Sequence, residues 1–266
     1  MVDRSGKQVI WCTPDDGSDV PLASRIFAFA VVLLLLSGLF WFAFSKLMYG
    51  WNWQAVWQYR QKLVQGWLVT VLISAAALAL SLLISVFFAV ARRSRLLLLR
   101  YFALIYIECV RGTPLLVQIL VFFYVVADAF GISNRYAVGI VTLALFSGAY
   151  LSEIIRAGIE SIGESQFESA RAIGLTRFQT YRFVVIPQVI RRILPPLAGQ
   201  FASLIKDSSL LSIIAISEFT LNAQEINSYT FSTMESYLPL AAGYLLLTLP
   251  ISLFSRRLEQ KYLYAT

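Results

Sequence analysis

Apolar blocks, each about as long as a bilayer is thick, are the feature that most constrains this chain. They lie at about residues 25–45, 66–91, 113–130, 136–157, 195–217 and 237–254. A helix needs about 20 apolar residues to cross a hydrocarbon core roughly 30 Å thick. Only 14% of the residues are charged, whereas a soluble domain carries about 25%. The blocks therefore predict an all-α integral membrane protein with six transmembrane helices.

The distribution of basic residues predicts the orientation. The net charge is +7, and the basic residues flank the apolar blocks instead of forming one stripe, so no nucleic-acid partner is expected. With the N-terminus inside, 17 of the 22 Lys and Arg residues fall on the cytoplasmic side, as the positive-inside rule requires. The segment from Glu218 to Ser236 then forms an outside loop. Both termini are predicted to be cytoplasmic.

Several chemistries are excluded by composition. The chain contains no histidine, so histidine catalysis and histidine metal ligation cannot occur. Cys12 and Cys109 lie far apart and fit no metal or redox spacing. No phosphate-binding P-loop pattern is present. We expect no catalytic residue, metal or cofactor in this chain, and any ATP and Mg must be bound by another protein.

Residues 96–130 are too long for one span and predict a break. Arg111, Gly112, Thr113 and Pro114 interrupt the apolar run. Thr113 suits an N-cap and Pro114 a first helical position. The sequence therefore predicts a helix at 96–110 along the membrane surface and a span from 113 to about 130.

A polar segment between the fourth and fifth blocks predicts a helical hairpin. Gly174 suits a left-handed helix end, Thr176 an N-cap, and Pro187 the end or kink of the second helix. We expect Ile162, Phe167, Ala170 and Ile173 to form an apolar face on the first helix. Such a hairpin would need a protein partner for that face, although periodicity equally allows an ordinary amphipathic connector.

The residues of this hairpin resemble the EAA loop of binding-protein-dependent ABC importer permeases. That pattern is E-A-A, three residues, G, nine residues, then I-x-L-P. Glu168, Ala170, Gly174 and Pro187 match it at that spacing, and Leu175 follows the glycine. Ser169, Val184 and Ile186 are mild replacements.

Further stretches are similar to the polar amino-acid branch of that family. They are residues 66–71, 111–118, 147–156, 194–200 and 203–210. The resemblance covers the chain from about Gly66 to its C-terminus. It implies a five-helix type I permease core with one extra N-terminal helix. The implied parts are a cytoplasmic tail (1–24), an extra helix (25–46), a periplasmic loop (47–65), and a transmembrane domain (66–262) with a cytoplasmic coupling loop (160–192).

The resemblance also implies the partners. A dimer of ABC ATPase subunits would bind the coupling loop through Glu168, Ala170, Gly174, Leu175 and Pro187. A second permease subunit, identical or merely similar, would complete the pathway through the bacterial inner membrane. A solute-binding protein would deliver an amino acid, and lipid would surround the spans.

Charged residues within the spans are candidates for the solute pathway. Glu153 shares a helix face with Arg156, and either lines the pathway or forms a structural pair. Lys206 and Asp207 fall at mid-depth, where a charge is costly. With Ser208 they predict a helix break lining a cavity, or else a salt bridge between helices. An ion-coupled secondary transporter that uses Asp207 and Glu153 remains the alternative function. No catalytic constellation supports a membrane enzyme, and mid-membrane charge argues against a scaffold.

Overall fold

The computed structural model describes residues 22–46 and 49–263, and all their regular elements are helices. This confirms the predicted all-α fold class. Internal contacts divide the chain into two units, one ending at Trp51 and the other beginning at Asn52. Cys12 and residues 1–21 of the predicted cytoplasmic tail lie outside the described residues.

The helix of the first unit, α1 (Leu22–Ser45), carries apolar residues around its whole circumference. Phe29, Leu34 and Trp41 are 70%, 70% and 75% exposed. Its 24 residues extend about 36 Å at 1.5 Å per residue. A helix that is hydrophobic all round and this long is typical of a membrane span.

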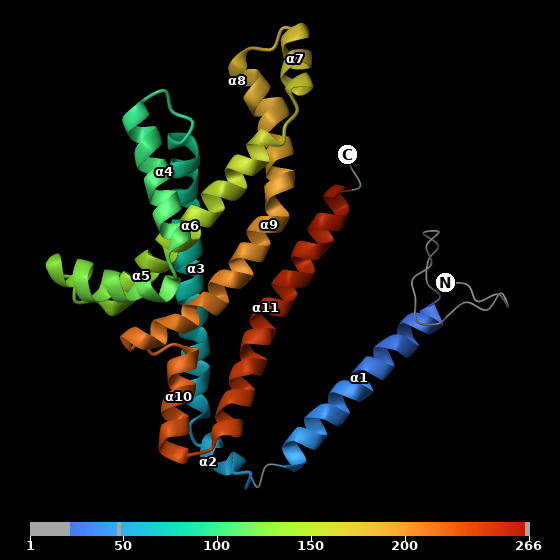
Figure 1. Cartoon of the computed structure of the whole chain (residues 1–266), viewed down its shortest axis with the longest axis vertical. Coiled ribbons are helices and arrows are strands. Elements are labelled where there is room, and N and C mark those ends of the chain that lie inside the picture. Colours follow the sequence, from blue (N-terminus) through green and yellow to red (C-terminus); the bar gives the residue numbers. More distant parts are fainter. Residues whose placement is uncertain (1–21, 47–48, 264–266) are drawn as a thin grey trace. The chain divides into compact units, whose positions relative to one another are not determined.

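The second unit contains the remaining helices, which Figure 1 shows in chain order from teal to red. They are α2 (Trp53–Trp57), α3 (Arg60–Ala91), α4 (Leu97–Gly112), α5 (Leu115–Val121), the π-helical η1 (Phe122–Ala127), α6 (Arg135–Glu160), α7 (Glu164–Ala172), α8 (Arg177–Gln179), the π-helical η2 (Thr180–Val185), α9 (Ile186–Asp207), the 3-10 helix η3 (Ser208–Ile214), α10 (Phe219–Thr230) and α11 (Thr233–Leu263). The long helices α3, α6, α9 and α11 form the body of this unit.

Small residues allow α3 and α6 to cross closely. Ala77, Ser81 and Ser85 recur every fourth residue on α3 and are fully buried. On α6, a Cβ built on Gly148 would lie 2.6 Å from the Ile84 side chain. Residues four apart share a helix face, and small side chains on that face bring two backbones together in membrane proteins. Much of the packing between α3 and α6 therefore follows from local sequence spacing.

The hydrophobic core lies about midway along α3, where α5, α6, α9 and η3 converge. Its buried members are Ile73, Ala77, Leu115, Ile119, Leu143, Leu204, Leu211, Ile214 and Ile216. Burying each large aliphatic side chain contributes roughly 1.5–3 kcal/mol against exposure to water, and within lipid the gain comes from packing instead. The core thus includes residues of α9 and of η3, on both sides of the change in helix type.

The predicted count of six spans is not confirmed. In the described residues, four helices are long and apolar enough to cross a membrane, or five if the bent pair formed by α4 and α5–η1 counts as one. The helix α9 has 22 residues but carries Arg191, Arg192, Lys206 and Asp207. Its charged residues, not its length, exclude it from the helices counted as apolar enough to cross a membrane.

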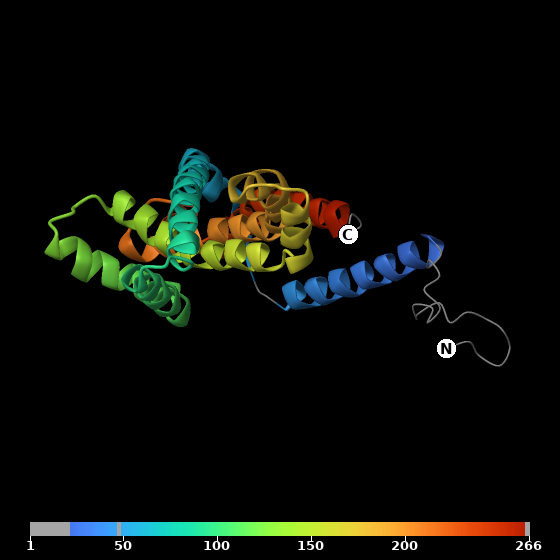
Figure 2. The same cartoon turned by 90° about the horizontal axis from the view of Figure 1, so that it is seen from above.

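The orientation predicted for residues 96–130 is wrong. The pair is bent by 111°, and it is α4 that runs beside α3, packing Ala103 and Ile107 against Phe88. Both views show the segment from α5 into η1 leading away from α3 (Figure 1 and Figure 2). The aromatic contacts of Phe88, including the stacked Tyr106 ring at 3.9 Å, hold α4 in this place. Such contacts cannot be read from hydropathy.

Three further boundaries differ from prediction. The second span begins at Arg60, before Gly66, although it ends at Ala91 as predicted. The fifth helix begins upstream of Pro195, which lies inside α9. The predicted outside loop from Glu218 contains α10, and the Glu218 side chain is fully buried. Polar residues or prolines stand at each predicted boundary, and for Glu218 the distant partners Thr70 and Tyr244 explain its burial.

Candidate functional site

The predicted hairpin exists, and its turn is built by Gly174. The helix α7 is followed by Gly174 at φ +79, a left-handed conformation that only glycine adopts readily. The Gly174 N–H donates to the Arg171 carbonyl at 3.0 Å, and the Leu175 N–H donates to the Ala170 carbonyl at 3.0 Å. This pair of bonds is a Schellman motif, which satisfies the last carbonyls of a helix. The turn is therefore specified locally by the sequence.

The second arm of the hairpin begins at a capping box. The Gln179 N–H donates to Thr176 Oγ1 at 3.3 Å, and the Thr176 N–H donates to Gln179 Oε1 at 2.9 Å. These reciprocal bonds satisfy two free donors at a helix start. The capped C-terminus of α7 and the capped N-terminus of α8 lie on either side of Gly174, so the turn between them is short and well defined.

Pro187 was predicted to end or kink the second arm, and the structure excludes the first of these outcomes, because the arm continues beyond it. Helical structure continues from α8 through η2 into α9, and Pro187 stands in the first turn of α9. Proline lacks an N–H and clashes with the carbonyl four residues back. The wider π-helical turn at Thr180–Val185 lies immediately before it, and π-turns accommodate such interruptions. The arm therefore runs as one helix from Arg177 to Asp207.

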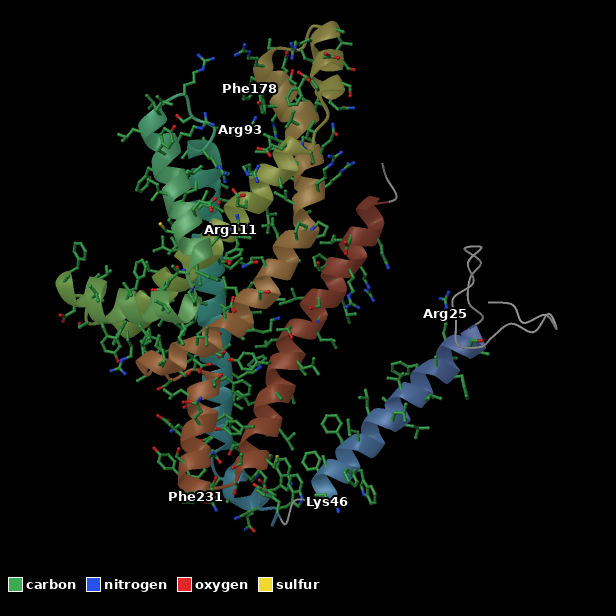
Figure 3. The ribbon with its side chains drawn as sticks, viewed as in Figure 1. Arg25, Lys46, Arg93, Arg111, Phe178 and Phe231 are labelled. Carbon is green, nitrogen blue, oxygen red and sulfur yellow. The ribbon has the colours of Figure 1, made fainter. Side chains whose placement is uncertain are left out.

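The base of the hairpin is packed and its tip is exposed. Ile162 and Val185 are buried together with Val189, and Ala170 is also buried. At the tip, Ile173 and Phe178 are 75% and 77% exposed. Of the residues predicted to share one apolar face, Ile162 and Ala170 are therefore buried within this chain, whereas Ile173 is exposed. Figure 3 shows Phe178 at the end of the second unit where α7 and α8 lie.

A hollow of about 370 Å³ lies between the two arms. It is lined by Phe167, Arg171, Leu175, Arg177, Thr180 and Tyr181. Glu168 lies exposed on α7. The tip thus offers two apolar side chains and two arginines, a combination enriched at protein interfaces.

Glu153 is surrounded by arginines from three helix ends. Its carboxylate pairs with Arg92 at the end of α3, with Arg156 Nη2 at 2.9 Å and with Arg111 Nη1 at 3.4 Å. Arg156 also pairs with Glu160. Only 16% of the Glu153 side chain is exposed. These contacts support the structural alternative for Glu153, because its oxygens already have partners.

Lys206, Asp207 and Ser208 lie where α9 changes into η3. Lys206 is exposed, Asp207 is partly buried and Ser208 is fully buried. The Ser208 hydroxyl donates to the Ile205 carbonyl at 2.7 Å. Asp207 and Glu153 share no hydrogen bond or ion pair within the part of the chain that the structure describes. The two predicted pathway sites are therefore separate features.

The residues at the predicted break separate α4 from α5. The helix α4 ends at Gly112, and Pro114 occupies the N-cap position of α5, so Thr113 is not the N-cap. The Thr113 hydroxyl instead donates to the Cys109 carbonyl at 2.8 Å. Gln118 Nε2 donates to the Val110 carbonyl at 2.7 Å. These side chains satisfy carbonyls that the sharp bend leaves free.

Two polar clusters were missed in the sequence. The buried Glu218 carboxylate accepts hydrogen bonds from the Thr220 and Leu221 N–H groups at 2.8 and 2.7 Å, from the Tyr244 hydroxyl at 3.1 Å and from the Thr70 hydroxyl at 3.4 Å. An acidic residue just before a helix is an N-cap signal that could have located it.

The second missed cluster lines a hollow of about 480 Å³ beside the start of α3. Lys62 pairs there with Glu225 of α10. Glutamines at 58, 61 and 65 recur along one face at helical spacing. The spacing of the glutamines is visible in the sequence, whereas Glu225, the partner of Lys62, lies far from Lys62 in it.

Comparison with known proteins decides the family. Residues 81–264 match the profile of the binding-protein-dependent transport system inner membrane component family. The chain belongs to this family. It is 36% identical over 212 residues to the glutamine transport system permease protein GlnP of Escherichia coli (strain K12), covering 79% of this chain and 97% of that protein.

A second relative and two solved structures agree with this assignment. The chain is 34% identical over 203 residues to the probable glutamine ABC transporter permease protein GlnM of Bacillus subtilis (strain 168), covering 75% of this chain and 94% of that protein. A crystal structure of an amino acid ABC transporter with histidines superposes with a TM-score of 0.72 at 35% identity, over 79% of this chain and 100% of that chain. An inward-facing MetNI methionine ABC transporter gives a TM-score of 0.60 at 14% identity, over 78% of this chain and 97% of the other, and shows the fold alone. The fold is that of type I ABC permeases.

Proposed function

We propose that this chain is the membrane-spanning permease subunit of an ATP-driven importer of polar amino acids, with glutamine as its first candidate. Two glutamine permeases cover most of its length, which supports the substrate class. The exposed tip of the hairpin carries the proposal. Ile173 and Phe178 have no cover in the described chain, and an apolar tip of this kind needs a partner.

The partner of that tip is an ABC ATPase subunit, which binds the ATP and Mg that this chain lacks motifs to bind. Arg171 and Arg177 would meet acidic groups around an apolar groove, because charge complementarity steers such docking. Two ATPase subunits, a second permease subunit and an external solute-binding protein complete the assembly. The complex would lie in the bacterial inner membrane, with both termini of this chain in the cytoplasm.

Coupling would pass through one helix. The arm from Arg177 to Asp207 links the hairpin to the change of helix type at Lys206 and Asp207. A packed helix moves as a rigid body, whereas a flexible loop would absorb the motion. Closure of the ATPase dimer would thus shift the segment containing Asp207 and Ser208, where a solute can meet charge and hydroxyl groups.

The test is assembly and uptake by a reconstituted complex carrying Gly174→Asp. A Cβ built on Gly174 meets no described atom within 4 Å, but a side chain is strained at its φ of +79, so the change should distort the turn that the ATPase contacts without a steric clash inside the hairpin. Gly131→Asp is the matched control, because Gly131 also has a left-handed φ of +65 and open space around it. We expect Gly174→Asp to lose ATPase copurification or ATP-dependent glutamine uptake, and Gly131→Asp to retain both.

A Gly174→Asp complex with normal assembly, ATPase stimulation and uptake would refute the coupling role. Uptake by the wild-type chain that needs an ion gradient and no ATPase would establish the secondary-transporter alternative. A panel of labelled amino acids in the same vesicles would test the choice of glutamine.

A further inference from the structure

Residues at the start of α3 line the hollow that holds Lys62 and Glu225. The start of α3 lies at the opposite end of the second unit from α7 and α8 (Figure 1). The lining of this hollow is polar along one side, with Gln58, Gln61 and Gln65 in a row and Lys62 and Glu225 forming an ion pair. Its volume of about 480 Å³ falls within the range of small-ligand sites. If the hairpin docks on the cytoplasmic ATPase, this hollow opens on the side from which the solute arrives.

The charged groups of Lys62 and Glu225 are paired with each other but remain partly exposed to solvent. The side chains of Lys62 and Glu225 are 32% and 35% exposed. The Lys62 ammonium also lies 5.4 Å from the centre of the Tyr229 ring. An amino acid carries one ammonium and one carboxylate, so a fixed carboxylate and a fixed ammonium side by side are complementary to it. An exposed ion pair of this kind contributes little to stability by itself.

Asn222 adds an observation that a structural ion pair does not explain. Its side chain is 3% exposed, and its Nδ2 donates to the Lys62 carbonyl at 2.8 Å. Its Oδ1 is buried and has no hydrogen-bond partner among the residues that the structure describes, although it belongs to a residue that lines the hollow. Buried polar atoms without a partner are rare and call for an explanation. A ligand that donates an N–H would supply one.

Gly66 makes room for this arrangement. A Cβ at Gly66 would lie 2.6 Å from Asn222 Nδ2 and 3.0 Å from the Glu218 carbonyl. The absence of a side chain at 66 therefore lets α10 approach α3 closely enough for Asn222 and Glu225 to line the same hollow as Lys62.

We propose that this hollow is an entrance subsite for the zwitterionic head group of an amino acid. The ammonium of the solute binds between the Glu225 carboxylate and Asn222 Oδ1, its carboxylate binds the Lys62 ammonium, and the glutamine amides contact its polar side chain. This inference rests on the proposed function for the class of solute, but it concerns a site separate from Lys206 and Asp207. Binding exchanges the Lys62–Glu225 pair for two pairs with the solute.

The experiment compares analogues that lack one charge, using the permease–ATPase complex in nanodiscs without the solute-binding protein. Labelled L-glutamine is displaced by unlabelled L-glutamine, by glutaramic acid, which lacks the ammonium, or by 4-aminobutanamide, which lacks the carboxylate. Each variant is described by two ratios, the affinity of each analogue relative to glutamine. We expect both analogues to bind the wild-type complex at least tenfold more weakly than glutamine.

Each substitution should erase discrimination against one analogue alone. Glu225→Gln and Asn222→Ala should each reduce at least fivefold the loss of affinity shown by glutaramic acid relative to glutamine. Lys62→Gln should reduce at least fivefold the corresponding loss shown by 4-aminobutanamide. Asp128→Asn, which neutralises an exposed carboxylate outside the hollow, should leave both ratios unchanged. A purely structural ion pair would change assembly or stability without moving one ratio selectively.

Unchanged ratios in Glu225→Gln and Lys62→Gln, in complexes that still bind glutamine, overturn the subsite. Unchanged ratios with weaker docking of the loaded solute-binding protein also overturn it, and identify the hollow as a protein-docking socket. A wild-type complex that takes up no amino acid overturns the proposed function together with the subsite, whereas uptake with unchanged ratios overturns the subsite alone.

Discussion

Replacing Glu153 by Gln should destabilise the protein more than removing any one of the arginines around it. In the wild type, Glu153 and Glu160 face Arg92, Arg111 and Arg156. Removing the central carboxylate leaves three cations with one carboxylate at the edge. Removing Arg92 leaves two cations with two carboxylates. The cost therefore depends on which partner is lost, not on the number of ion pairs broken.

The burial of these groups sets the magnitude. Removing one partner of a fully buried pair costs about 3–5 kcal/mol, and an exposed pair is worth about 0–1 kcal/mol. The Glu153 side chain is 16% exposed and the arginines are 22–39% exposed. An intermediate cost of about 2 kcal/mol is expected for Glu153→Gln, and at most about 1 kcal/mol for Arg92→Gln. At roughly 2 °C per kcal/mol for a chain of this size, Glu153→Gln should lower the Tm by about 4 °C.

The assay is thermal unfolding of both single variants and the double variant in the same detergent. Because Arg92→Gln removes one of the uncompensated cations, the double variant should be less destabilised than the sum of the singles. Glu259→Gln, at an exposed position of α11, should stay within about 0.5 kcal/mol of the wild type. The reasoning is refuted if Glu153→Gln costs no more than Arg92→Gln, or if the two changes are additive.

Other substitutions test packing, polar satisfaction and the pathway. Gly158→Ala should cost about 1–3 kcal/mol in thermal unfolding, because its Cβ would lie 2.3 Å from the Ile193 side chain. The control Gly199→Ala on α9, whose Cβ would meet no described atom within 4 Å, should cost nothing. Equal losses of stability in the two variants would contradict the steric explanation. Glu218→Gln should cost about 1–3 kcal/mol because an amide N–H₂ cannot accept from the donors around it; an unchanged Tm would contradict the assigned bonds. Asp207→Asn should alter glutamine uptake while ATPase copurification stays normal; lost assembly would favour a structural role.

Much of the hairpin could be predicted from the sequence because its determinants are local. The left-handed glycine at 174 and the Thr176 cap act on backbone groups within five residues, and both were predicted. The sequence left open whether Pro187 ends or kinks the second arm, because that outcome depends on the turn before it and on the packing of Val185 and Val189 at the base. The roles of the hairpin residues toward the ATPase stay predictions.

The sequence by itself determined the membrane class, the end of α3 at Ala91 and the caps of the hairpin, because these depend on apolar length and on neighbouring residues. Only the tertiary structure decided which polar residues are partnered. Thr70 and Glu218 are 148 positions apart, and Arg92 and Glu153 are 61 apart. No local pattern encodes such a pair, since it exists only where two helices have packed. For the same reason, a segment read as an outside loop proved to hold a buried carboxylate.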